Sequence, residues 1–385
     1  MGFFIFKNFY ERHLGNFLIF SLCFFLIGSI LHKFDEYFYY DNWVHPATAF
    51  IKLMFFFFFI VILLLNFKTQ RTFFLYLSGF FIVFLIANMK WPVTNSGYDF
   101  FDSLKASNFF YLFKYLYPFV FFAVFLLVKN KEEIIHRYFV IIENVLIVNA
   151  FFVFLGFFLS IDFFQSYPHS NRFGYDGLLG RMFFIYFSTL VILRRLFLEK
   201  IDLKMLIIAL ASLLSGTKLV LLFFILVTVF YLYEKRKLSI LFFVSIVLVL
   251  GIFFIEPILN SVSQVFPFWQ PLLSKHGSLT LLLSERDLLV QNMIEYIKIK
   301  CTLKNYLFGG MEFTRYATQM DFIDLFLFFG IVGSGLYIVL FSKLVNKHYH
   351  FIPIILSCFA GGFLFGTIIV TTYFLWMYES NFEQK

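Results

Sequence analysis

The sequence predicts an all-α polytopic membrane protein, and its composition, its repeated apolar stretches and the placement of its basic residues all indicate this class. Hydrophobic residues make up 61% of the 385 residues, charged residues make up 14%, and the mean hydropathy is +0.85. Soluble domains carry about 25% charged residues. The 66 Phe residues fit lipid-facing positions and require no aromatic ligand site. The composition therefore excludes an ordinary soluble protein.

About 11 apolar stretches are expected to form transmembrane helices, because roughly 20 apolar residues cross about 30 Å of hydrocarbon. The shortest stretch is retained because Ser215, Gly216 and Lys218 can turn the chain at the bilayer edge. We expect a single transmembrane domain over 1–385 with a loop inserted at 256–321. The expected spans are 15–31, 47–66, 72–89, 109–128, 138–160, 182–198, 203–215, 217–233, 238–255, 322–342 and 351–377.

Basic residues concentrate in every second loop between these stretches, which predicts the orientation of the chain. Lys and Arg are retained on the cytoplasmic side of a membrane. We therefore expect a cytoplasmic N-terminus, an extracytoplasmic 256–321 loop and Lys385 on the outer side. The rule also accounts for the net charge of +8 without a nucleic-acid partner. The cytoplasmic loops hold Lys7, Arg12, Lys68, Arg71, Lys129, Lys131, Arg137, Arg194, Arg195, Lys200, Lys204, Lys235, Arg236, Lys237, Lys343 and Lys347.

The 256–321 loop is expected to contain one amphipathic helix. Ser284 and Asp287 have the spacing of a capping box, which marks a helix start. Gly309 and Gly310 mark its end. Its apolar face consists of residues at helical spacing, which are Val290, Met293, Ile294, Ile297 and Cys301. We expect this helix to lie along the membrane face or over a cavity, with its apolar side down.

Five cations are expected at the outer ends of helices. They are Arg172, Arg181, Lys218, Arg286 and Arg315. Arginine suits bidentate phosphate binding, so an anionic head group is their simplest common target. Taken alone, Lys218 is better explained by a side chain that snorkels to the interface. The carboxylates of Glu285 and Asp287, next to Arg286, are better explained by capping of a helix N-terminus than by catalysis.

Acidic residues offer a candidate base in two places. Glu312 and Asp321 approach the span that begins at residue 322, and Asp324 lies one turn into it. A carboxylate at that depth is costly unless it faces protein or water, while Asp321 equally marks the membrane interface. The first outer loop contributes Asp35 and Glu36, for which a solvated surface is the default interpretation.

Three segments resemble Wzy-type O-antigen and capsular polysaccharide repeat-unit polymerases, which belong to the same superfamily as the O-antigen ligases. The segments are SGTKLVLLFF from Ser215, SERDLLVQNMIEYIKIKCTLKNYLFGG from Ser284 and MEFTRYATQMDFIDLFLFFGIVGSGLYI from Met311. The large late outer loop of a chain with many spans is similar too. The pattern of an arginine, ten further residues and then a glycine, typical of some members, is not present after Arg172 or Arg286. The late loop also lacks the histidine of the ligases near the next span, which favours a polymerase.

The resemblance implies glycosyl transfer in the bacterial cytoplasmic membrane. A glycan on undecaprenyl diphosphate is the donor, and the sugar hydroxyl of a lipid-linked repeat unit is the acceptor. The five cations would bind the diphosphate, and Asp321 or Glu312 would take the acceptor proton. No nucleotide or metal cofactor is required, and membrane lipid and a chain-length regulator are the expected partners.

Three alternatives stay open at this point. An O-antigen ligase would use a similar outer site. A multispan transferase that uses polyprenyl-phosphate sugars would depend on Asp35 and Glu36 instead. A flippase would carry charges at mid-span, where Lys114 and Glu143 are the exceptions in otherwise apolar stretches.

Overall fold

The computed structural model describes residues 2–38, 44–88, 106–168, 172–253, 255–265, 269–311, 316–364 and 366–382. Over these residues the protein is helical, apart from turns and one isolated bridge between Gln165 and Tyr175. The predicted all-α class is therefore confirmed. The helices are α1 Gly2–Phe38, α2 Val44–Leu65, α3 Arg71–Asn88, α4 Ala106–Phe125, α5 Lys131–Leu159, η1 Asp162–Phe164, α6 Arg181–Phe197, α7 Leu203–Leu213, α8 Lys218–Glu234, α9 Leu238–Phe253, α10 Ile255–Val265, α11 Trp269–Leu283, α12 Arg286–Lys300, α13 Leu303–Phe308, α15 Asp321–Ser342, η2 His348–His350, α16 Phe351–Phe359 and α17 Thr367–Phe382.

Five of these helices are long and apolar enough to cross a membrane, which is the property expected of an all-α membrane protein. The spanning segments are His13–Phe38, Arg71–Asn88, Asn108–Phe125, Lys131–Leu159 and Asp321–Ser342. Each of the remaining predicted stretches also contains helix, most of it in shorter elements such as α7 and α16, although α2 has 22 residues. The number of about 11 spans stays a prediction from the apolar runs of roughly 20 residues.

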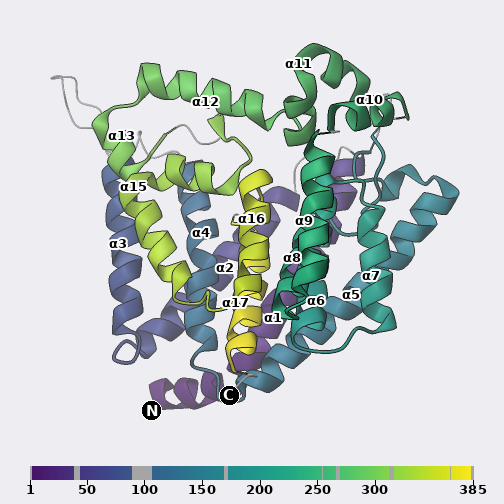
Figure 1. Ribbon diagram of the computed structural model, residues 1–385. Coiled ribbons are helices and arrows are strands. Elements are labelled where there is room, and N and C mark those ends of the chain that lie inside the picture. The colour runs from purple at the N-terminus through teal and green to yellow at the C-terminus, as the bar shows by residue number, and fades with distance from the viewer. Residues whose placement is uncertain are drawn as a thin grey trace.

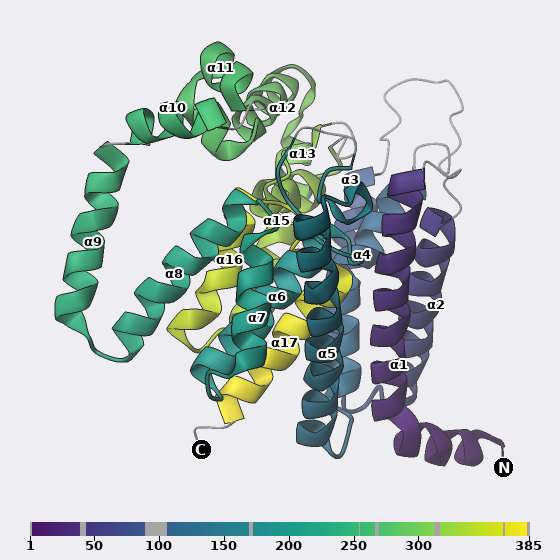
Figure 2. The same cartoon turned by 90° about the vertical axis from the view of Figure 1, so that its right-hand side faces the viewer.

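The helices form an up-and-down bundle with α10–α13 laid across one end of it (Figures 1 and 2). The beginning of α1 and the end of α17 both lie at the opposite end. The connections from α2 to α3, α4 to α5, α6 to α7 and α8 to α9 lie toward that same end. These connections and the adjoining helix ends carry most of the basic residues assigned to the cytoplasmic side, so those residues gather at one end of the bundle.

The predicted span 351–377 is wrong, because the chain reverses direction within it. Helix α16 ends at Phe359, and Gly362 adopts a positive φ of 99° in the turn that follows. His350 Nε2 lies 2.6 Å from Ser380 Oγ, so the start of α16 is beside the end of α17. The end of α17 is thus at the same end of the bundle as the start of α1, not at the outer end.

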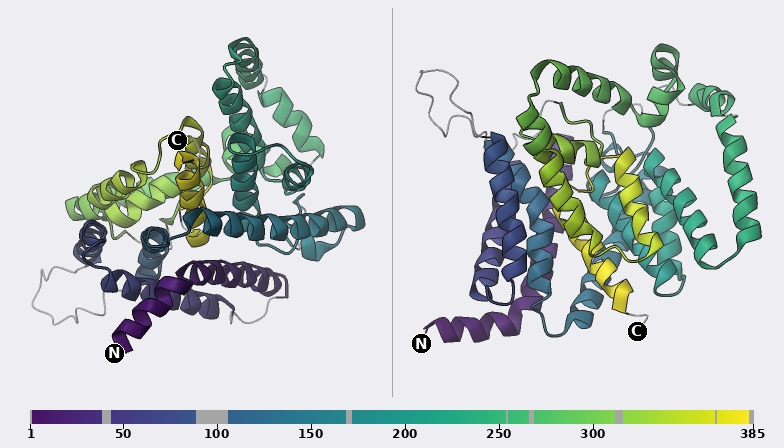
Figure 3. Two further views of the ribbon diagram at one scale, coloured as in Figure 1. Left: turned by 90° about the horizontal axis from the view of Figure 1, so that it is seen from below. Right: turned by 60° about the vertical axis from the view of Figure 1, so that its left-hand side comes forward.

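Helix α17 occupies the centre of the bundle. In the end-on view of Figure 3, the yellow C-terminal segment lies between the purple, teal and green helices. Its side chains Tyr373, Phe374 and Trp376 are fully buried. Near its end, Glu379 accepts hydrogen bonds from Arg194 Nε and Nη2 on α6, both at 2.7 Å. Apolar packing and this bidentate pair hold the central helix in place.

Glu143, which the sequence places at mid-span, is paired rather than open to a transport path. Arg195 donates hydrogen bonds to both of its carboxylate oxygens, and Arg194 Nη1 lies 3.6 Å from Oε1. Because a buried carboxylate is retained in an apolar bundle only with such partners, Glu143 is explained by structure.

Candidate functional site

Four of the five predicted cations lie at the end of the bundle that α10–α13 cover. Arg181, Lys218 and Arg286 are the first residues of α6, α8 and α12, and Arg172 lies in the connection between α5 and α6. These helices start there because each apolar stretch is preceded by glycine, serine or charged residues. The fifth cation, Arg315, and the predicted base Glu312 lie outside the described residues.

Tyr167 brings the first two cations together. The guanidinium carbon of Arg172 lies 4.9 Å from the centre of the Tyr167 ring, and that of Arg181 lies 4.3 Å from it. An aromatic face attracts cations within about 6 Å. One tyrosine therefore holds two arginines side by side, and sequence analysis did not single it out.

Arg286 joins the same group from the covering layer. Its Nε donates to the carbonyl oxygen of Gln319 at 3.1 Å, and its Nη1 donates to that of Leu283 at 3.1 Å. Burial lowers the pKa of Arg286, while Tyr167 acts in the opposite direction and Arg181 adds to the lowering. Since arginine is not deprotonated in proteins, the guanidinium stays charged at neutral pH.

Lys218 connects the start of α8 to the covering layer. Its Nζ donates to the carbonyl oxygen of Leu281 and, at 3.2 Å, to Ser284 Oγ. It also lies 5.1 Å from the centre of the Trp269 ring. The contacts with three residues of the late loop favour a tertiary role for Lys218 over simple snorkelling. The late loop is thus tied to the bundle at Lys218, whereas both hydrogen bonds of Arg286 lie within the loop.

The predicted capping box is wrong. Ser284 and Glu285 have positive φ values of 53° and 67°, so the chain turns sharply before α12. The carboxylate of Asp287 accepts a hydrogen bond from Thr280 Oγ1 at 2.5 Å, and no side chain caps the helix. A tertiary contact with α11 has replaced the local contact that the spacing indicates.

A helix, α12, forms where the sequence predicts one, but its end is earlier than predicted and only part of the predicted apolar face is covered. Met293 is buried and Val290, Ile297 and Cys301 are partly buried, whereas Ile294 is 42% exposed. The helix ends at Lys300, and α13 starts separately with a capping box formed by Thr302 and Asn305. In the sequence, the spacing of Thr302 and Asn305 indicates this second helix start.

Asp321 is enclosed by a distant turn. Its carboxylate accepts hydrogen bonds from the backbone N–H groups of Gly362 at 2.8 Å and of Phe363 and Leu364 at 2.9 Å. The residue has no exposed surface. Asp321 therefore holds the turn between α16 and α17, in addition to the role as base that stays a prediction.

The carboxylate of Asp324 also accepts hydrogen bonds from a nearby residue. Its Oδ1 accepts from Thr318 N at 2.7 Å and from Thr318 Oγ1 at 2.9 Å. Because these bonds satisfy a carboxylate that would otherwise be unpaired in an apolar helix, they explain its position. The segment before α15, which also supplies the Gln319 carbonyl to Arg286, is thereby held in place.

A buried ion pair positions the connection that carries Arg172 and Arg181. Lys33 Nζ lies 2.8 Å from Asp176 Oδ1 and donates to the Gln165 carbonyl at 2.5 Å. Asn149 accepts from the N–H groups of Leu178 and Leu179 and donates to the Asp176 carbonyl. Sequence analysis missed Lys33 and Asn149 in these roles. The signal for Asn149 was its polarity inside the apolar stretch 138–160, whereas Lys33 follows the stretch 15–31 and gave no such signal.

The first outer loop contributes little that the structure describes. Asp35 is 7% exposed and its Oδ1 has no hydrogen-bond partner in the described part of the chain. Glu36 is exposed and lies near enough to Asp176 to affect its charge. Neither residue contacts the four cations in any interaction found among the described residues.

No family model, curated protein or solved structure matches this chain. Among the residues that the structure describes, no group of three or more His, Cys, Asp or Glu is placed to hold a metal ion. The candidate site is therefore described by its own residues and their chemistry, without reference to a related protein. It consists of four cations, one shared tyrosine and backbone carbonyls at a covered end of an apolar bundle, an arrangement suited to binding an anion.

Proposed function

We propose that this protein is a glycan polymerase of a bacterial cytoplasmic membrane. It transfers an undecaprenyl-diphosphate-linked polysaccharide chain onto a lipid-linked repeat unit in O-antigen or capsule biosynthesis. The observation that carries the proposal is the convergence of Arg172, Arg181, Lys218 and Arg286 at one end of an apolar helical bundle. An amphiphilic diphosphate has the charge for these cations and the hydrocarbon for the bundle surface.

The reaction requires charge stabilisation more than covalent chemistry from the protein. The sugar C1–oxygen bond to the diphosphate breaks as the acceptor hydroxyl oxygen forms the new glycosidic bond. The leaving diphosphate gains negative charge, which preorganised cations stabilise. The acceptor proton passes to a base, for which Glu312 and Asp321 are the candidates, and Arg315 is the proposed fifth cation.

The covering layer supports the same proposal. Lys218, the first residue of α8, donates to a backbone carbonyl of α11, so the covering helices lie directly against the bundle end that holds the cations. A layer of this kind limits water near the leaving group and strengthens each charge interaction there. Extracytoplasmic placement of this end, with the N-terminus in the cytoplasm, belongs to the same proposal.

Removal of single cations tests the proposal. In a strain that makes the polysaccharide, Arg181→Ala, Lys218→Ala and Arg286→Ala should reduce long chains at least tenfold while single repeat units remain. A tenfold loss corresponds to about 1.4 kcal/mol of transition-state stabilisation. Gel separation of the lipid-linked and transferred glycans measures both products.

Arg137→Ala is the matched control, because Arg137 is exposed at the opposite end of the bundle and is 3.9 Å from its nearest carboxylate, Glu133. Membrane levels of every variant are compared by immunoblot. Normal ladders in all three site variants would contradict the proposed polymerase. Loss of glycan attachment with normal chain lengths would indicate a ligase, and loss only with Asp35→Ala and Glu36→Ala would indicate the other transferase class.

A further inference from the structure

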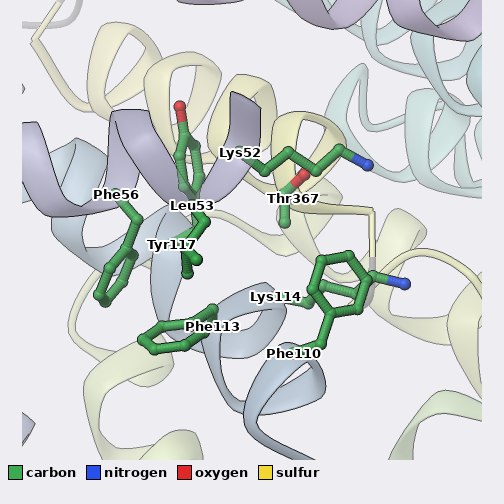
Figure 4. Close-up of a pocket in the computed structure, with 8 residues that line it drawn as sticks. All are labelled: Lys52, Leu53, Phe56, Phe110, Phe113, Lys114, Tyr117 and Thr367. Carbon is green, nitrogen blue, oxygen red and sulfur yellow. The ribbon is translucent and has the colours of Figure 1, made fainter. Parts of the chain in front are cut away.

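Two lysines lie within apolar helices at a small pocket that the proposed reaction does not use. Lys52 is on α2 and Lys114 is on α4, each about two turns from the start of its helix. Figure 4 shows both side chains in the pocket, with their amino groups on the same side of it. Thr367, the first residue of α17, also lines this pocket.

The surroundings of the two ammonium groups are aromatic. Lys52 Nζ lies 5.5 Å from the centre of the Phe25 ring, and Lys114 Nζ lies 4.6 Å from that of Phe110 and 4.9 Å from that of Tyr111. The pocket walls contain Phe56 and no carboxylate. Aromatic faces compensate only part of the cost of placing a cation in an apolar helix.

Neither ammonium group has a hydrogen bond or an ion pair within the part of the chain that the structure describes. The two charges also repel each other. Lys33 and Lys218, by contrast, each bind oxygen atoms of the protein. Lys52 and Lys114 therefore form a pair of like charges for which the described residues supply no counter-charge.

We propose that this pocket binds a phosphate group, supplied by a lipid head group or by free phosphate. Two ammonium groups match the two negative charges that a phosphate monoester can carry, and each offers three donors to its oxygens. The Thr367 hydroxyl adds a neutral donor at the pocket wall. The aromatic lining excludes water and accommodates the first carbons of an attached chain.

The binding site stands independently of the glycosyl transfer proposed above. Its residues come from α2, α4 and α17, whereas the four cations come from α6, α8, α12 and the connection before α6. A binding measurement on the purified protein contains no glycan. Failure of one proposal is therefore distinguishable from failure of the other.

Titration calorimetry with dodecyl phosphate and with inorganic phosphate tests the site in the full chain in detergent. We expect Lys52→Met and Lys114→Met each to weaken dodecyl phosphate binding at least tenfold and the double variant to abolish it. Lys343→Met is the matched control, because Lys343 is exposed and lies over another aromatic ring, that of Tyr76. Its binding should equal that of the wild type.

The two probes distinguish the sources of the phosphate. Binding of dodecyl phosphate alone identifies a lipid head group, and equal binding of both probes identifies free phosphate. Unchanged affinity in the double variant, or no binding of either probe to the wild type, overturns the proposal.

Since variants can misfold, acylation by an amine-reactive reagent is also followed on the wild type by mass spectrometry. The bound probe should protect Lys52 and Lys114 but not Lys343, and equal modification of all three overturns the site.

Discussion

At the scale of single residues, the Lys33–Asp176 pair helps to position the connection before α6, near Arg172 and Arg181. Both side chains are 1% exposed, and the pair joins the end of α1 to the connection before α6. Burial raises the pKa of Asp176 to about 7, although Lys33 and Arg181 act to lower it. The folded protein therefore binds this proton more tightly than the unfolded chain does, and Asp176 reduces stability as pH rises from about 4 to about 7.

Lys33→Met should destabilise the protein by about 3–5 kcal/mol at pH 8, because it leaves a buried carboxylate without its partner. The loss should shrink as the pH falls from 8 toward 7, and it should stay constant below about pH 7, where Asp176 is protonated in both folded proteins. Thermal unfolding of the purified protein in detergent at several pH values measures both effects.

The double variant Lys33→Met/Asp176→Leu is the control for this prediction, since it removes both charges and should recover much of the loss. Arg137→Met breaks an exposed pair and should cost less than about 1 kcal/mol. If Lys33→Met were as stable as the double variant at pH 8, the ion pair would have no role in holding the connection.

At the scale of elements, glycines and one carboxylate break two predicted spans. Gly330 has a φ of 63° and divides α15, so residues 321–329 form a separate segment against α13, visible as the bend of α15 in Figure 1. Gly310 N donates to the Phe328 carbonyl at 3.1 Å. The three backbone bonds to Asp321 likewise determine where α16 stops and α17 begins. Gly330 and Gly333 lie in close contact with neighbouring atoms, whereas a Cβ atom at Gly335 would meet nothing within 4 Å.

Gly309→Ala should destabilise the protein, because a Cβ atom there would lie 2.2 Å from the Phe328 carbonyl oxygen and φ is +81°. We expect a loss of about 1–3 kcal/mol and faster proteolysis between α13 and α15. The Gly335→Ala variant is the control, since a Cβ atom there meets nothing within 4 Å and a helical glycine replaced by alanine gains roughly 0.5–1 kcal/mol. Equal proteolysis rates in the two variants would rule out the close approach.

At the scale of the whole molecule, the reversal at α16 and α17 changes the topology. An odd number of spans places the two chain ends on opposite sides of a membrane, whereas the structure has the beginning of α1 and the end of α17 at one end of the bundle. The covering helices α10–α13 lie at the other end. The four cations therefore lie on the side away from both chain ends.

Cysteine labelling should reproduce this arrangement. In a background in which Cys23, Cys301 and Cys358 are replaced by serine, Lys298→Cys on exposed α12 should react with an impermeant maleimide in cells with a permeable outer layer. Lys237→Cys and Phe382→Cys should react only after the membrane is opened. The wild-type residues at all three positions are exposed, so burial does not limit reaction. If the impermeant reagent labelled both Phe382→Cys and Lys298→Cys in intact membranes, the two positions would lie on the same side and the number of spans would be odd.

Several features were predictable from the sequence because they depend on local composition. Apolar runs bounded by charges determine helices wherever they occur, so α1–α9 fall in the predicted stretches. A helix of this kind begins where polar residues give way to apolar ones. The hydropathy pattern alone therefore places Arg181, Lys218 and Arg286 at helix ends. Their meeting at one end follows from alternating helix direction.

The tertiary structure decided what depends on contacts between distant residues. Asp321 reaches a turn about 40 residues later, Lys33 pairs with Asp176, and Tyr167 gathers two arginines from one connection. Hydropathy cannot reveal these contacts, because a buried polar group is stable only with a partner whose position the fold sets. The sequence by itself determined an apolar all-helical protein with cations at helix ends, and only the folded chain decided which of those charges meet and which spans break.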